Sequence, residues 1–171
     1  MTNCLRTPAI TACLLLASSP SIAALDPADS RAIITACERL LADYAIYRDH
    51  LDADEFANTF SADGVLVLGS GTSRGRAEIR ENITSRQSPG VAHMILLTTI
   101  RITPVDEYNA TGFSYAIILN GDRPVSAGDP PIPMDGITAA VEYHTEFVLT
   151  DEGWKISRLE LKPVVRGPGI A

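Results

Sequence analysis

Proton transfer by histidine, aspartate and tyrosine side chains is the chemistry that this chain favours. The three histidines, His50, His93 and His144, lack the spacing of a metal site such as His-x-x-x-His. No phosphate-binding loop occurs in the sequence, since Gly69-Ser70-Gly71 is not followed by a Gly-Lys-Ser or Gly-Lys-Thr segment. A neutral histidine can accept a proton, a carboxylate on its other ring nitrogen can fix its tautomer, and a tyrosine hydroxyl can stabilise a developing enolate. Such groups together could remove a proton beside a carbonyl and expel water or another group.

Tyr44, Asp49 and His93 are the candidates for this chemistry, and each also has a purely structural interpretation. Tyr44 lies on an apolar helical stripe and could be a core aromatic residue. Asp49 could be a solvated carboxylate at the end of a helix, and His93 a hydrogen-bonded histidine at the start of a strand. His144 alternates with acidic residues along a polar strand face, which favours the surface or a subunit interface.

The first 23 residues have the pattern of a cleaved secretory signal peptide. Arg6 gives a positive start, residues 9–17 form an apolar run, and Ser21 and Ala23 are small residues before the expected cleavage point. The run is too short to anchor the protein in a bilayer, so we expect a secreted or periplasmic protein without a membrane anchor. Residues 24–165 are long enough for one domain.

The charge of the chain is acidic, with 14 Lys and Arg against 21 Asp and Glu and a formal net charge of −7. This balance, without a basic run, argues against nucleic acid or an anionic membrane as a partner. Cys4 and Cys13 precede the expected cleavage point, so the mature chain keeps only Cys37 and cannot form an internal disulfide. Cys37 lies on an apolar stripe, which indicates a core residue.

Three helices are expected in the first half of the domain. Asp26 is a typical N-cap, followed by Pro27 at the first helical position, and Asp52 is a second candidate cap. Apolar residues at three- and four-residue steps continue the first helix to Asp49. The expected helices span residues 27–49, 52–60 and 76–86, with a turn over 60–64 and a short buried strand over 65–68.

The second half is rich in β-branched and alternating apolar residues, which predicts strands. The expected strands span residues 91–103, 110–119, 137–149 and 154–164, and Asp151-Glu152-Gly153 marks a tight hairpin between the last two. Glycine and proline make residues 120–136 an irregular loop, and residues 166–171 a disordered tail. Helices followed by antiparallel strands indicate an α+β fold in which the helices cover one face of the sheet.

These motifs, in this order, resemble the SnoaL-like branch of the NTF2-like superfamily. The resemblance rests on Tyr44 with Asp49 five residues later, Asp52, an aromatic residue before the small-Asp-Gly segment at 61–64, Gly75 to Ile79, the strand-start His93, and Gly153-Trp154-Lys155-Ile156. It covers about residues 28–163. It implies a cone in which three N-terminal helices pack on a strongly curved, mainly antiparallel sheet that encloses a pocket.

The resemblance also implies an activity and a set of roles. The bile-acid dehydratase pattern is the nearest to Tyr44, Asp49 and His93, whereas ketosteroid isomerase needs a carboxylate base about where this chain has Leu68. Thr145 stands where many relatives carry an aspartate. The expected function is a cofactor-independent lyase of dehydratase type, acting on a small hydrophobic or polycyclic carbonyl compound.

In this hypothesis His93 is the base, Asp49 orients it, and Tyr44 binds the carbonyl oxygen. Two alternatives remain open: a non-catalytic small-molecule-binding or interaction domain of the same fold, and an isomerase or cyclase with the same residues. The resemblance further implies a homodimer through the outer face of the sheet, which carries Glu142 and His144.

Overall fold

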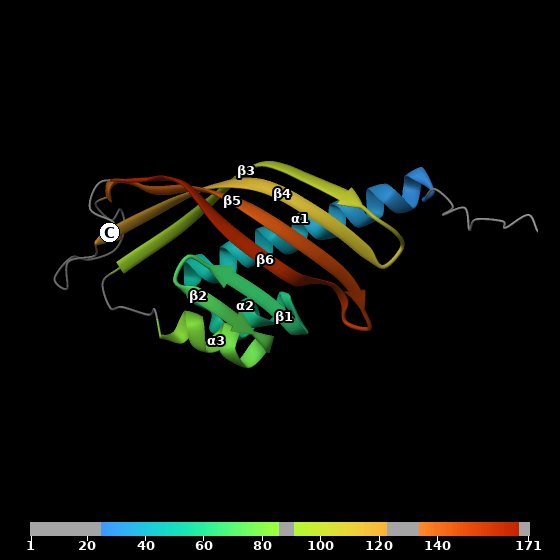
Figure 1. The fold of residues 1–171 in the computed structure, drawn as a ribbon, viewed down its shortest axis with the longest axis horizontal. Helices are drawn as coiled ribbons and strands as arrows, with labels where there is room; N and C mark the ends of the chain where they lie inside the picture. The colour runs from blue at the N-terminus through green and yellow to red at the C-terminus, as the bar shows by residue number, and fades with distance from the viewer. Residues whose placement is uncertain (1–24, 86–90, 123–133, 168–171) are drawn as a thin grey trace, which may run out of the picture.

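The computed structural model describes residues 25–85, 91–122 and 134–167. The predicted signal peptide, most of the predicted loop over 120–136 and residues 168–171 lie outside these ranges. The chain folds into three helices and one six-stranded sheet, an α+β arrangement that confirms the predicted fold class (Figure 1).

The helices are α1 (Pro27–His50), α2 (Ala53–Asn58) and α3 (Gly75–Thr84), close to the predicted ranges. Asp26 caps α1 by accepting a hydrogen bond of 2.7 Å from the Ala28 N–H, as its residue type predicts. Leu51 ends the helix in a left-handed conformation, with φ 59°. Asp52 then caps α2 through the Glu55 N–H at 3.2 Å. The two helices therefore meet in a short, well-defined corner.

The sheet has the strand order β2-β1-β6-β5-β4-β3. Its strands are β1 (Phe60–Leu68), β2 (Gly71–Arg74), β3 (Val91–Pro104), β4 (Asn109–Asp122), β5 (Met134–Thr150) and β6 (Gly153–Arg166). The β1–β6 pair is parallel and the other four pairs are antiparallel. The sheet is thus mixed but mainly antiparallel, and it stays open between its edge strands β2 and β3.

The prediction of a turn over residues 60–64 was wrong, because the structure places them within β1. Phe60 pairs with Ile156 and Val65 with Arg158, so the residues between them bulge out of the parallel pair. A Cβ on Gly64 would lie 2.8 Å from the Phe60 Cβ and 3.0 Å from the Ile156 carbonyl oxygen, which leaves room for glycine alone. The turn-like composition therefore belongs to a bulge.

The sequence also missed β2 and underestimated the length of three later strands. β2 is only four residues long and lacks an apolar run, although Ser73 within it is buried. β4 continues to Asp122 and β5 begins at Met134, so both ends of the predicted loop are strand. β6 includes Arg166, and the Gly167 N–H donates to the Thr138 carbonyl oxygen at 2.8 Å.

The core lies between the sheet and the helices. α1 runs across one face of the curved sheet, whereas α2 and α3 lie at the end formed by β1 and β2 (Figure 1). The buried stripe of α1 contains Ile33, Cys37, Leu41 and Tyr44, at the spacing that the sequence predicts. None of the helices in the described ranges is long and apolar enough to pass through a membrane.

Candidate active site

The last turns of α1 carry three polar side chains of the candidate site, Tyr44, Arg48 and Asp49. Tyr44 and Arg48 are four residues apart and therefore share a helix face, and both line a cavity. Tyr44 is 3% exposed, and its ring centroid lies 4.8 Å from that of Phe56. Asp49 follows directly after Arg48 but points to a different neighbour, the edge strand β3.

Asp49 and His93 form a hydrogen-bonded pair between α1 and β3. The Asp49 Oδ1 lies 3.2 Å from the His93 Nδ1. The Ile95 N–H also donates to this carboxylate, at 3.0 Å to Oδ1 and 3.1 Å to Oδ2. The side chains are only 19% and 16% exposed. A backbone donor therefore anchors the carboxylate, and the carboxylate in turn orients the imidazole through Nδ1.

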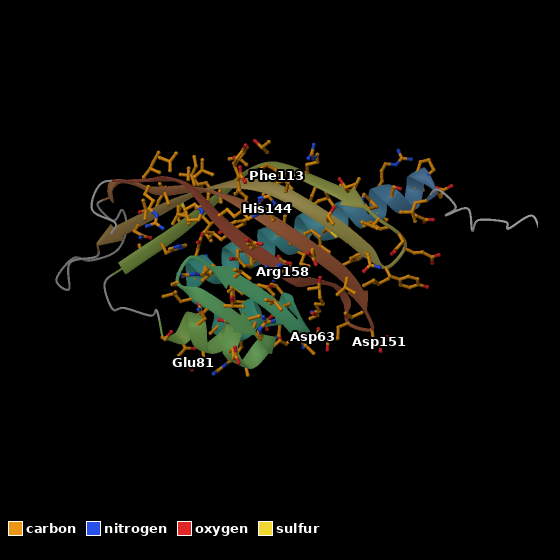
Figure 2. The ribbon with its side chains drawn as sticks, in the orientation of Figure 1. Asp63, Glu81, Phe113, His144, Asp151 and Arg158 are labelled. Carbon is orange, nitrogen blue, oxygen red and sulfur yellow. The ribbon has the colours of Figure 1, made fainter. Side chains whose placement is uncertain are left out.

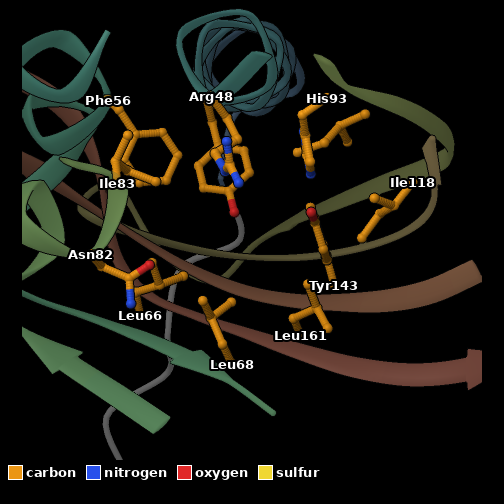
Figure 3. A pocket seen from close by; sticks show the side chains of 12 residues that line it. Arg48, Phe56, Leu66, Leu68, Asn82, Ile83, His93, Ile118, Tyr143 and Leu161 are labelled. Atoms are coloured by element: carbon orange, nitrogen blue, oxygen red, sulfur yellow. The ribbon is translucent and has the colours of Figure 1, made fainter. Parts of the chain in front are cut away.

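His93 lines a cavity of about 100 Å³. Its polar lining consists of Tyr44, Arg48, Asn82, His93 and Tyr143, and Asp49 lies behind His93, outside this lining. The remaining wall is apolar. Figure 3 shows His93 and Tyr143 pointing toward one another across the cavity. The Nδ1 of His93 faces Asp49, so the free ring nitrogen, Nε2, is the one available for a bound molecule.

Tyr143 is a second tyrosine at this site. It is 1% exposed, and its ring meets the Tyr44 ring edge-on, with centroids 5.8 Å apart. Burial, and then the charge and hydrogen bond of Tyr44, raise the pKa of Tyr143 well above its ordinary value, while Arg48 opposes this shift. Like any tyrosine hydroxyl at neutral pH, the Tyr143 hydroxyl is protonated and can donate a hydrogen bond.

The structure thus brings all three predicted site residues, Tyr44, Asp49 and His93, to one region. It adds Arg48 and Tyr143, which the sequence could have indicated. Arg48 lies one turn beyond Tyr44, and the alternation of β5 already placed Tyr143 on the apolar face.

Asn82 could not be found from the sequence. It belongs to α3, and only the packing of α3 against the end of the sheet brings it to the cavity.

The other positions that the sequence singled out do not supply an acid, a base or a nucleophile to the cavity. Leu68 lines the cavity as an apolar residue, where an isomerase of the ketosteroid type would need a carboxylate. Thr145 is buried on the inner face. Burial raises the pKa of the Cys37 thiol to about 12, so it cannot serve as a nucleophile at neutral pH. Within the described ranges, no three His, Cys, Asp or Glu side chains come together in a group that could hold a metal ion.

His144 lies apart from the pair formed by Asp49 and His93. Its Nε2 is 3.0 Å from the Glu142 Oε2. Its ring centroid is 5.4 Å from that of Phe113, and the two residues lie beside one another on the sheet (Figure 2). Its alternation with the buried Tyr143 places it on the outer face, as the sequence predicts.

Comparisons with solved structures show the same fold. A proposed scytalone dehydratase from Novosphingobium aromaticivorans is 20% identical, with a TM-score of 0.67, over 82% of this chain and 90% of its own. A proposed aromatic ring hydroxylase from this organism is 25% identical, with a TM-score of 0.65, over 82% and 93%. An NTF2-like protein with a cystatin-like fold, also from this organism, is 24% identical, with a TM-score of 0.61, over 82% and 88%.

A search of curated proteins gives no significant match. The model of the SnoaL-like domain family matches residues 29–160, which is most of the chain and nearly all of the described fold. The match includes nearly all of α1, the strand that carries His93 and every residue of the cavity lining except Leu161. Together with the helix and strand order, it shows that the chain belongs to the SnoaL-like family of NTF2-like proteins.

Proposed function

We propose that the protein is a cofactor-independent lyase of dehydratase type that acts on a small hydrophobic carbonyl compound. The observation that carries this proposal is the contact of 3.2 Å between Asp49 and His93, with His93 lining a cavity whose wall combines apolar side chains with two tyrosines and other polar groups. A carboxylate that holds one nitrogen of a histidine leaves the other nitrogen ready to accept a proton. The apolar side chains beside it lower the local dielectric constant and so strengthen the charge interactions within the site.

The elimination can be written with the residues of this cavity. The substrate carbonyl oxygen accepts a hydrogen bond from the Tyr44 or Tyr143 hydroxyl. His93 Nε2 removes a proton from the carbon beside the carbonyl, and the C–H electron pair moves to the carbonyl oxygen as an enolate. Asp49 stabilises the imidazolium that forms. The enolate then collapses, the bond to the β-hydroxyl breaks, and that oxygen takes the proton from His93 and leaves as water.

The size of the cavity limits the substrate. A volume of about 100 Å³ is of the same order as the roughly 150 Å³ of an engineered cavity that binds benzene. This favours a compound of one ring or less over a polycyclic one. The name of one similar structure, a proposed scytalone dehydratase, supports elimination of water, and the name of another, a proposed ring hydroxylase, points to a different reaction.

The experiment is conversion of 3-hydroxycyclohexanone to cyclohexenone and water, followed by the absorbance of the conjugated ketone and by NMR. The lyase proposal expects cyclohexenone to form faster than in buffer. An isomer of the starting ketone as product would favour the isomerase alternative. Binding of 3-hydroxycyclohexanone without conversion would favour the non-catalytic alternative, and either result would overturn the lyase proposal.

A further inference from the structure

The end of the cavity opposite β3 is formed by α3, and its polar group there is the amide of Asn82. The Asn82 Oδ1 is buried and accepts no hydrogen bond from any described residue. Figure 3 shows this amide directed toward the interior, among Leu66, Leu68 and Ile83. A buried carbonyl oxygen without a donor is unfavourable, so such an oxygen in a binding cavity points to a donor supplied by the ligand.

The two ends of the cavity have opposite hydrogen-bonding character. Tyr143 and Tyr44 present hydroxyl groups at one end, and a protonated tyrosine hydroxyl can donate a hydrogen bond to a ligand. Asn82 presents an acceptor at the α3 end. A carbonyl oxygen is favoured at the tyrosines, and its lone pairs would be repelled by the Asn82 oxygen. A ligand that satisfies both ends therefore needs an acceptor at one end and a donor at the other.

We infer that Asn82 is the specificity-determining residue that binds the hydroxyl group of a small hydroxy-carbonyl substrate. The inference rests on the proposed function and deepens it. In the elimination, the hydroxyl O–H donates to the Asn82 Oδ1 while its oxygen faces His93, and the same donated bond holds the departing water. Asn82 transfers no proton. Its contribution is to select substrates that carry the hydroxyl and to orient the C–O bond that breaks.

The test uses two aldehydes of matched shape that cannot undergo elimination, 3-hydroxybenzaldehyde and 3-methylbenzaldehyde. Their dissociation constants are measured by ligand-observed NMR or calorimetry. The parent protein should bind the hydroxy compound about 10-fold more tightly, the scale of one well-formed hydrogen bond. Asn82→Leu should reduce this preference to about one, mainly by weakening the hydroxy compound. Asn58→Leu, the same change at an exposed position of α2, should keep the preference.

Asn82→Asp keeps an acceptor at this position and removes the amide donor. It should retain a preference of several-fold for the hydroxy compound. This variant also separates a lost hydrogen bond from a lost fold, and thermal unfolding of each variant checks the fold directly.

No preference in the parent, or an unchanged preference in Asn82→Leu, would overturn the assignment. Loss of the preference in Asn82→Asp as well would overturn the acceptor role. These results are independent of the lyase proposal, which is tested by cyclohexenone formation. A protein that prefers the hydroxy aldehyde but forms no cyclohexenone keeps the Asn82 assignment and loses the lyase proposal. A protein that forms cyclohexenone but shows no preference for the hydroxy aldehyde keeps the lyase proposal and loses the Asn82 assignment.

Discussion

At the scale of single residues, the Asp49 carboxylate has two partners on β3, one a ring nitrogen and the other a backbone N–H. The backbone bonds from Ile95 are 3.0 and 3.1 Å long and place the carboxylate whether or not the imidazole is present. His93, by contrast, has its orientation set by Asp49. In the proposed function, β3 therefore positions the Asp49 carboxylate, the carboxylate orients the His93 imidazole, and the imidazole acts on the substrate.

Replacing Asp49 by Asn should lower the rate of cyclohexenone formation by about 10²–10⁴, the scale of a positioned acid–base group. An amide cannot stabilise the imidazolium that forms when His93 takes a proton. The dissociation constant for 3-hydroxybenzaldehyde should change little, because Asp49 does not line the cavity. Asp43→Asn, an exposed position on α1, is the control and should leave the rate unchanged. A rate equal to the parent's in Asp49→Asn would show that the pair is structural.

Cys37 gives a prediction on pH dependence. Its thiol is fully buried, and burial raises its pKa from 9.0 to about 12. Below pH 9 the thiol is protonated in the folded and unfolded states alike. Between pH 9 and 12 only the unfolded chain ionises, so the free energy of unfolding should fall as the pH rises through this window. Urea titrations at pH 8 and pH 10 measure this loss.

The matched variant is Cys37→Ala, in which this part of the pH dependence should disappear. A parent and variant with the same loss between pH 8 and pH 10 would contradict the prediction. Ellman's reagent at pH 8 offers a second check, since it should leave Cys37 unmodified until urea unfolds the chain.

At the scale of elements, β3 contains a local irregularity beyond the site. Its register against β4 shifts between Thr98 and Arg101, and Thr99 has φ 52°, a left-handed conformation that β-branched residues rarely adopt. Thr99 is exposed, so a substitution there changes the backbone cost without disturbing the core.

Thr99→Asn should therefore stabilise the protein by about 1 kcal/mol, because asparagine tolerates the left-handed region better than threonine does. The measurement is the free energy of unfolding from urea titration. Thr98→Asn, at an exposed neighbouring position in ordinary strand conformation, should not stabilise. Equal effects of the two substitutions would show that the conformation of Thr99 carries no strain.

The helices and strands differ in how far the sequence could predict them. α1 was predictable because its cap, its proline and its apolar stripe agree. The bulge in β1 was not, because Ser61, Asp63 and Gly64 have the composition of a turn and only the pairing with β6 makes them part of a strand. Short β2 has no apolar run, and its strand conformation depends on its pairing with β1.

At the scale of the whole molecule, the outer face of the sheet is divided into apolar and charged rows. Strand register aligns Leu96, Ile117, Ala140 and Val165 across β3, β4, β5 and β6. Leu96 is 43% exposed and Val165 58%. Further along the strands the rows contain His144 and Glu160 instead. The apolar row is continuous across four strands.

We propose that a second copy of the chain packs against this outer face. Ile117→Asp places a charge in the middle of the apolar row and should shift the protein from dimer to monomer in light scattering at micromolar concentration. Ile46→Asp, at an exposed apolar position on α1, should leave the dimer intact. A parent protein that is monomeric at this concentration would contradict the proposal.

The candidate site was only partly predictable from the sequence, because the cavity depends on how the whole chain folds. Asp49 and His93 were found as spaced residues that resemble a family pattern, and the structure places them in contact. The alternation of β5 could have indicated the inward direction of Tyr143, but Asn82 comes from α3, and no local spacing relates the two residues. The cavity between them exists only once the sheet curves over the helices, so its size and its hydrogen-bonding groups could not be read from the sequence.

The most direct test of the central claim, that His93 is the base in this cavity, is hydrogen exchange beside a carbonyl. Cyclohexanone in D₂O at neutral pH should take up deuterium at its α-carbons faster with the parent protein than in buffer, as followed by NMR. In His93→Ala, with the fold verified by circular dichroism, the enhancement should fall by about 10²–10⁴ toward the buffer rate. Exchange in His93→Ala at the parent rate, or no enhancement by the parent, would contradict the account.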